Sequence, residues 1–277
     1  SYSYSQWVKT TIPLGGNIFT MVSMDSYLLA GTLRYGQSGT SSGIYRSNDN
    51  GITWSPFTMS PRGIFTIIKD SLKLLAGTDD GLFVSTDGGS NWYKPNPGFH
   101  SPIHSLAVRG QNIFQSRSNV QLSTNYGGTW NEVLSLSTPA IGIIGNSVLA
   151  GTDNNGIYRS TNNGTNWTQV DPSSYSTNAL ITNGSNIYAT KVNGLFVSND
   201  SGQTWSQLYN SNVKQMVLSG TNIICGGLNG INISTNNGIN WIQKNEGFGS
   251  NTSVNYLLVV NGMLYASIDS NVWRRPI

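Results

Sequence analysis

The sequence predicts an all-β protein, a seven-bladed β-propeller whose blades are four-stranded antiparallel sheets. Three observations predict this fold. An eight-residue pattern recurs six times at nearly constant spacing, short alternating apolar runs separate its copies, and the two ends of the chain supply complementary parts of one further repeat. We therefore expect residues 1–277 to form a single propeller domain.

The repeated pattern is S-x-[DN]-x-G-x-x-W. Its copies are 36 to 38 residues apart, and they end at Trp54, Trp92, Trp130, Trp167, Trp205 and Trp241. The third position of the pattern is an acid or its amide, at Asp49, Asp87, Asn125, Asn162, Asp200 and Asn236. A fixed period of this length marks a repeat architecture, in which one supersecondary unit cannot bury its hydrophobic face alone.

The segments between the copies are predicted to form strands and turns. Residues 64–69, 72–78, 82–85 and 92–94 are short apolar or alternating runs, and Gly, Asn, Asp and Ser separate them. These are strand and turn signals, and four of them in one period are the content of one propeller blade. Second strands often end in Ala-Gly, as at Ala30-Gly31 and Ala150-Gly151, which predicts a close approach of neighbouring sheets there.

The two termini complete each other. Residues 5–9 (SQWVK) resemble the segment that ends each repeat, whereas residues 254–260, 263–268 and 271–274 supply three strands without a fourth. We expect the N-terminal strand to become the fourth strand of the last blade. Such a 3+1 closure removes the exposed sheet edges of an open array and raises the number of blades to seven.

The residue types of the pattern suit a turn between the third and fourth strands. Asp or Asn accepts hydrogen bonds from main-chain N–H groups further along the turn, and Gly supplies a positive φ. The tryptophan buries about 150–250 Å² between sheets. We interpret the pattern as a folding device, since three of its copies carry Asn in place of the acid that a metal site favours.

The pattern resembles the Asp-box, also called the bacterial neuraminidase repeat. This repeat occurs in sialidases, sortilin-type receptors, some xyloglucan hydrolases and photosystem II assembly factors. The resemblance implies a propeller whose boxes lie on the face opposite the usual active centre. It does not define an activity, because function depends on sites grafted onto folds.

Ligand-binding residues are therefore expected on the loops of the other face. The longest insertion, residues 33–42 (LRYGQSGTSS), joins the second and third strands of one repeat. Arginine and tyrosine among small polar residues suit recognition, although a solvated excursion is an equally good interpretation of this segment. The candidates on this face are Arg34, Tyr35, Arg62, Arg117 and Lys191.

A catalytic function is the alternative to ligand binding. The sialidases of the family use three arginines, a Tyr–Glu pair and an acid, but the Arg-Ile-Pro segment is missing and Glu132 and Glu246 are the only glutamates. A glycoside hydrolase with a carboxylate pair would use Asp79 or Asp80 with Asp153. Turns favour Asp in any case, so we assign no catalytic residue and keep Asp79 and Asp153 as weak candidates.

Composition narrows the function classes. The net charge of +3 arises from 15 basic and 12 acidic residues without a basic run, so nucleic acid is not an expected partner. There is no apolar run of 18 residues, so we expect no membrane insertion. No cofactor motif or metal-ligand spacing occurs in the sequence. We expect Cys225 to be a small buried apolar residue.

The leading hypothesis is a non-catalytic binding or scaffold propeller that recognises a glycan or a protein through the loop face. The Asn/Ser/Thr-rich repeats and the ending Val272-Trp273-Arg274-Arg275-Pro276 look like propellers of exported bacterial proteins, which predicts a secreted, cell-surface or periplasmic module of a larger protein.

Overall fold

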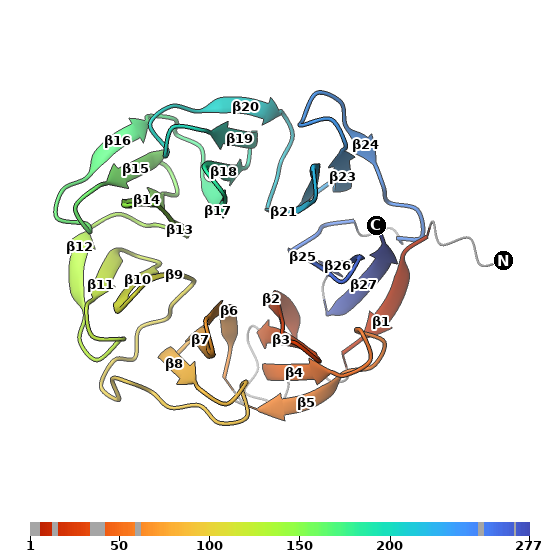
Figure 1. Cartoon of the computed structure of the whole chain (residues 1–277), viewed down its shortest axis with the longest axis horizontal. Helices are drawn as coiled ribbons and strands as arrows, with labels where there is room; N and C mark the ends of the chain where they lie inside the picture. The colour runs from red at the N-terminus through yellow and green to blue at the C-terminus, as the bar shows by residue number, and fades with distance from the viewer. Residues whose placement is uncertain (1–5, 13–15, 34–41, 59–61, 249–251, 269) are drawn as a thin grey trace. The chain divides into compact units, whose positions relative to one another are not determined.

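The computed structural model describes residues 6–12, 16–33, 42–58, 62–248, 252–268 and 270–277. Arg34 and Tyr35 lie outside these ranges. The described residues form strands, turns and loops and no helix, so none of them belongs to an apolar helix that could cross a membrane. The sheets are the blades of a seven-bladed β-propeller, which confirms the predicted fold class (Figure 1).

The chain divides into two compact units, and unit 1 comprises residues 1–93 and 214–277. Its strands are β1 (Val8–Thr11), β2 (Asn17–Ser23), β3 (Leu28–Leu33), β4 (Gly43–Ser47), β5 (Ser55–Thr58), β6 (Ile64–Asp70), β7 (Lys73–Thr78), β8 (Gly81–Ser85), β21 (Gln215–Ser219), β22 (Asn222–Gly227), β23 (Gly230–Ser234), β24 (Ile242–Gln243), β25 (Tyr256–Val260), β26 (Met263–Ile268) and β27 (Asn271–Pro276). They form antiparallel sheets with the orders β2-β3-β4-β5, β6-β7-β8, β21-β22-β23-β24 and β1-β27-β26-β25.

Unit 2 comprises residues 94–213 and contains three four-stranded antiparallel sheets. Its strands are β9 (Ser105–Arg109), β10 (Asn112–Ser116), β11 (Val120–Ser123), β12 (Asn131–Leu134), β13 (Ala140–Ile144), β14 (Ser147–Gly151), β15 (Ile157–Ser160), β16 (Thr168–Asp171), β17 (Thr177–Asn183), β18 (Asn186–Lys191), β19 (Gly194–Ser198) and β20 (Ser206–Tyr209). Consecutive strands pair within each sheet, as the repeat pattern predicts.

Every sheet has two ends, which we name by what they carry. The box edge holds the turns from the first to the second strand and from the third to the fourth. The loop edge holds the turns from the second to the third strand and the connections to the next sheet. The Asp-box pattern lies at the box edge, and Arg62, Arg117 and Lys191, the predicted ligand-binding residues within the described ranges, lie at the loop edge.

The N-terminal strand completes the last sheet, as predicted. β1 pairs antiparallel with β27, with Val8 opposite Arg274 and Thr10 opposite Val272, and the two strands lie side by side in Figure 1. Trp7 precedes β1 and is 4% exposed, and its Nε1–H donates to the main-chain oxygen of Lys244 at 2.7 Å. The closing strand is thus held by its ladder and by a buried tryptophan.

One sheet lacks a regular fourth strand. The segment 92–94, predicted to be a strand, is reduced to one bridge between Tyr93 and Val84 beside β8. In the sheet β21–β24, the third residue after the box tryptophan, Lys244, donates its N–H to the oxygen of Ile231 at 2.8 Å. The equivalent residue here is Pro95, which has no N–H, so the ladder ends after one bridge.

Neighbouring sheets approach closely at the Ala-Gly pairs. A Cβ atom added to Gly31 in β3 would lie 2.6 Å from Cγ2 of Ile64 in β6. One added to Gly151 in β14 would lie 2.5 Å from Cγ2 of Thr177 in β17. The absence of a side chain at these positions is therefore what allows the sheets to pack, which confirms the interpretation of these pairs.

A β-bulge recurs in the fourth strands. Ile44 pairs with Thr58 and Tyr45 pairs with Pro56, so that Phe57 in β5 has no partner in β4. The sheets of unit 2 repeat this register shift, with extra residues at Val133, Val170 and Leu208. Such a bulge bends the strand and locally disrupts the hydrogen-bond ladder to its neighbour.

Candidate functional site

Each Asp-box folds into a turn with the same hydrogen bonds. In the first, Ser47 Oγ accepts from the N–H of Gly51 at 2.8 Å, and Asp49 Oδ1 accepts from the N–H of Thr53 at 2.9 Å. The equivalent distances are 2.8 and 2.9 Å in the other five boxes. Two short polar side chains thus satisfy main-chain donors of the turn, as predicted.

The turn needs two successive residues with positive φ. The box glycine has φ of 74° at Gly51 and 83° at Gly202, as its position in the pattern predicts. The residue before it also has positive φ, 54° at Asn50 and 60° at Ser201. Sequence reasoning missed this second position, although Asn or Gly, which tolerate such a conformation, occupies it in four of the six boxes.

The box carboxylates are strong acceptors and poor proton carriers. Burial alone would raise the pKa of Asp49, but hydrogen bonds from Thr53, Ser47 and Ile52 outweigh it and lower the pKa to about 2. The hydroxyl and N–H of Thr204 likewise hold the pKa of Asp200 far below its ordinary value. These groups are ionised near neutral pH and serve the turn, which argues against general acid catalysis at the box edge.

The boxes also join neighbouring sheets. Arg159 in β15 donates from Nε to the main-chain oxygen of Ser201 in the box of the next sheet, at 2.9 Å. In unit 1, Arg274 Nη1 and Tyr265 Oη both donate to the oxygen of Asn50, at 3.0 and 3.1 Å. The main-chain oxygen of the positive-φ residue in the box thus accepts hydrogen bonds from side chains of the preceding sheet.

At the loop edge of unit 2, Asp153 links two connections between sheets. It lies in the turn between β14 and β15 and accepts from Ser137 Oγ at 2.5 Å and from Ser176 Oγ at 3.3 Å. Its N–H donates to the oxygen of Ser137 at 3.1 Å. This carboxylate, a weak catalytic candidate from sequence, is engaged in holding the loops together.

Arg117 lies nearby at the same edge, in the turn between β10 and β11. Its main-chain oxygen accepts from Thr138 N–H at 2.7 Å, while its exposed guanidinium has no hydrogen-bond or ion-pair partner within the described part of the chain. Burial and the charge of Arg117 lower the pKa of His104 to about 4, against the opposing effect of Asp153. His104 is therefore neutral at physiological pH, and Arg117 carries the free positive charge of this cluster.

Lys191 is buried rather than presented to a ligand. It ends β18, is 1% exposed, and its ammonium pairs with the carboxylate of Asp171. Nζ also donates to Ser173 Oγ at 3.0 Å and lies 4.9 Å from the centre of the Phe196 ring. Its charge is compensated inside the sheet.

Unit 1 pairs its loop-edge charges in a similar way. Arg62 Nη1 lies 2.9 Å from Asp80 Oδ2, and its guanidinium lies 5.9 Å from the centre of the Phe83 ring. The neighbouring carboxylate, Asp79, accepts from the N–H of Gly63 at 3.1 Å. Arg62 remains accessible, with 46% of its side chain exposed.

Metal-ligating and thiol chemistry finds little support in the residues that the structure describes. They include no group of three or more His, Cys, Asp or Glu side chains that would hold a metal ion. Cys225 in β22 is 1% exposed, and burial raises the pKa of its thiol. It therefore packs as a small apolar side chain, as expected from sequence.

Residues 45–56, which contain the first box, match the BNR/Asp-box repeat family. The other five boxes share its pattern and its hydrogen bonds, and the sheets are propeller blades. The chain is thus a β-propeller with six copies of the Asp-box pattern, the first of which lies in the segment that matches the family. A comparison with curated protein sequences finds no match.

Solved structures similar to this Asp-box propeller share its fold at low identity. The extracellular domain of BT4673 from B. thetaiotaomicron is 13% identical with a TM-score of 0.80, over 99% of this chain and 40% of that one. YCF48 bound to D1 peptide is 13% identical with a TM-score of 0.76, over 100% and 97%. The GH74 xyloglucanase from Xanthomonas campestris is 13% identical with a TM-score of 0.72, over 98% and 53%. The chain thus spans less than half of the first of these proteins.

The propeller's loop edge contains groups that sequence reasoning did not single out. Ser137, Ser176 and Asp171 were missed because their partners lie on other strands or neighbouring connections. A sequence signal did exist for another set. A glutamine stands two residues after the box tryptophan in three repeats, at Gln169, Gln207 and Gln243.

Proposed function

We propose that this Asp-box propeller is a non-catalytic binding or scaffold module of an exported protein that recognises a protein partner through its loop edge. The distribution of charge in unit 2 carries the proposal. Asp153 and Lys191 are engaged with other loop-edge groups, whereas Arg117 exposes a guanidinium without a partner among the described residues. Tyr175, 47% exposed, lies at the same edge. Arginine and tyrosine are enriched in protein interfaces.

The structural neighbours support this class of function. YCF48, which shares the fold over nearly its whole length, has been solved with a bound peptide, and the BT4673 neighbour is an extracellular domain. The same fold occurs in GH74 enzymes, so the fold alone leaves hydrolysis open. The hydrolase alternative requires Asp79 or Asp153 to act on a substrate, although each carboxylate already accepts hydrogen bonds from neighbouring loop residues.

Parallel binding and turnover measurements test the proposal. We expect saturable binding to members of a peptide array, weakened about tenfold by Arg117→Ala through loss of about 1.4 kcal/mol. Lys69→Ala, which removes a cation at the box edge, serves as the control and leaves binding unchanged. Binding to a glycan array alone would replace the protein partner by a glycan. Turnover of xyloglucan or sialosides that Asp153→Ala abolishes would overturn the non-catalytic assignment.

A further inference from the structure

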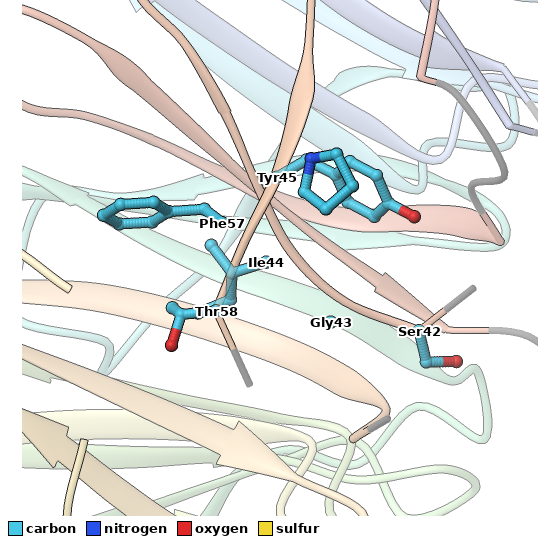
Figure 2. Close-up of a pocket in the computed structure, with 7 residues that line it drawn as sticks. Ser42, Gly43, Ile44, Tyr45, Phe57 and Thr58 are labelled. Carbon is cyan, nitrogen blue, oxygen red and sulfur yellow. The ribbon is translucent and has the colours of Figure 1, made fainter. Parts of the chain in front are cut away.

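A small pocket lies where β4 and β5 separate at the bulge. It has a volume of about 140 Å³, is partly open, and is lined by Ser42, Gly43, Ile44, Tyr45, Pro56, Phe57 and Thr58. Figure 2 shows the rings of Tyr45 and Phe57 extending in opposite directions from the two strands. The repeats allow a direct comparison of this pocket with the same place in other sheets.

In other sheets a glutamine occupies the position of Pro56. Pro56 lies opposite Tyr45, just as Gln169 lies opposite Tyr158 and Gln207 lies opposite Phe196. Gln243 holds the same register in the sheet β21–β24. The first sheet thus has a short, rigid ring where three others have a long polar side chain.

These glutamines fill the corner between the third and fourth strands. Gln169 Nε2 donates to the main-chain oxygen of Asn155 at 2.9 Å, across the start of the third strand. Gln207 and Gln243 make the same bond to Asn193 and Asn229, at 3.0 and 2.9 Å. Pro56 cannot reach across this corner, because its side chain returns to its own nitrogen. The pocket beside Ser42 and Gly43 is accordingly the place that a glutamine takes elsewhere.

Tyr45 gives the pocket an unused hydrogen-bond donor. The residue as a whole is 3% exposed, but its hydroxyl reaches the surface and has no hydrogen-bond partner in the described part of the chain. Burial also raises the pKa of Tyr45, so the hydroxyl keeps its proton and remains a donor.

We propose that this pocket binds the side-chain carboxamide of a glutamine in a partner peptide, supplied from outside where other sheets supply their own. The carboxamide oxygen accepts from Tyr45 Oη–H, and the methylene groups lie against the rings of Tyr45 and Pro56, which share one face of the sheet. The inference rests on the proposed function, since it assumes a protein partner. An apolar cavity of about 150 Å³ holds benzene, so the pocket has room for a group the size of propionamide. Ligand pockets for larger molecules measure about 300–1,000 Å³.

The test titrates the full chain with propionamide and follows chemical shifts of residues 42–58. We expect weak saturable binding, with butanone and propionate binding less well because each lacks the N–H that the glutamines of other sheets donate to a main-chain oxygen. Pro56→Gln places the chain's own glutamine in the pocket and abolishes binding. Tyr45→Phe weakens it about five-fold, the loss expected for one hydrogen bond. Tyr158→Phe, the matched position in β15, leaves it unchanged.

Equal binding of butanone and propionamide, or binding that survives Pro56→Gln, overturns the carboxamide assignment. Thermal unfolding of each variant shows whether a loss of binding reflects a loss of folding. Pro56→Ala introduces no side chain long enough to fill the pocket, so this variant must retain binding. A peptide identified on the array then separates the two proposals. If its binding depends on Arg117 but not on Pro56→Gln, the proposed function stands and the pocket inference fails. If propionamide binds as expected and no peptide does, the pocket stands and the protein partner fails.

Discussion

The guanidinium of Arg159 donates a hydrogen bond from Nε to the main-chain oxygen of Ser201, 2.9 Å away in the Asp-box of the next sheet. The box therefore does more than turn the chain from the third strand to the fourth. Because Ser201 and Gly202 both adopt positive φ, the turn offers its carbonyl to the neighbouring sheet. The repeat is a device for joining blades as well as for closing each one.

Arg159→Ala tests this link between sheets. Loss of the hydrogen bond leaves the oxygen of Ser201 without its donor, and we expect the free energy of unfolding to fall by about 1.5 kcal/mol. Arg117→Ala removes a guanidinium without a partner among the described residues and should change stability by less than about 0.5 kcal/mol. Urea denaturation of the two variants beside the wild type measures the difference. Equal stability of both variants would show that the bond contributes nothing.

The carboxylates of the Asp-boxes predict that the free energy of unfolding falls at acidic pH, and that an Asp→Asn exchange removes this dependence. The folded-state pKa of Asp49 is about 2, below the ordinary value of 3.8. A lowered folded-state pKa stabilises the protein above pH 4, and this contribution is lost as pH falls from about 4 to 2. Asp49→Asn, which copies the natural Asn162 box, should therefore lose less stability over that window. The difference should stay below about 1 kcal/mol, because the group is partly exposed and solvent screens its charge.

The reverse exchange is the matched control for the acid dependence. Asn162 Oδ1 accepts from the N–H of Asn166 at 2.9 Å, the same contact that the Asp boxes make. Asn162→Asp should consequently add stability loss between pH 4 and 2. Thermal unfolding at several pH values measures both variants, and identical profiles for wild type and both variants would refute the assigned role of the carboxylates.

Much of the fold can be predicted from the sequence because the same pattern of strands and turns recurs in each repeat. The tryptophan spacing predicts the number of blades, and the unmatched strand at residues 5–9 predicts the closure that β1 and β27 make. Local chemistry also predicts the box glycine. By contrast, the loss of a fourth strand beside β8 depends on one residue, Pro95, whose effect appears only when its position in the ladder is known.

The loop edge was less predictable, for a physical reason. The contact of Asp153 with Ser137 joins a turn within one sheet to the connection from the preceding sheet, and no local periodicity encodes which loops meet. Lys191 was selected as a cation on a polar loop, yet its ammonium is covered by Asp171 and Phe196. The pocket at Pro56 becomes visible only when the repeats are compared in register, because a single proline among turn residues carries no signal of its own.

Gly151→Ala tests the close packing of the sheets. The added Cβ would lie 2.5 Å from Cγ2 of Thr177, and both positions are buried, so β14 or β17 must shift. We expect a loss of about 1–3 kcal/mol, the usual cost of overpacking. Gly98→Ala is the control, because its Cβ would have Asn96 Oδ1 as its nearest neighbour at 3.6 Å. Chemical denaturation should show the control close to wild type, and a tolerated Gly151→Ala would contradict the packing argument.

The ion pair of Lys191 and Asp171 decides whether this lysine serves the fold or a ligand. Lys191→Met leaves a carboxylate with a side chain only 16% exposed without its cation, and we expect a loss of about 3 kcal/mol. Asp171→Asn leaves the buried ammonium of Lys191 without its anionic partner and should also lower the free energy of unfolding. The double variant removes both charges, so its loss should be smaller than the sum of the single losses by about 1 kcal/mol or more. Additive losses would argue against a coupled pair, and a stable Lys191→Met that binds a peptide less well would return Lys191 to the ligand-binding residues predicted from the sequence.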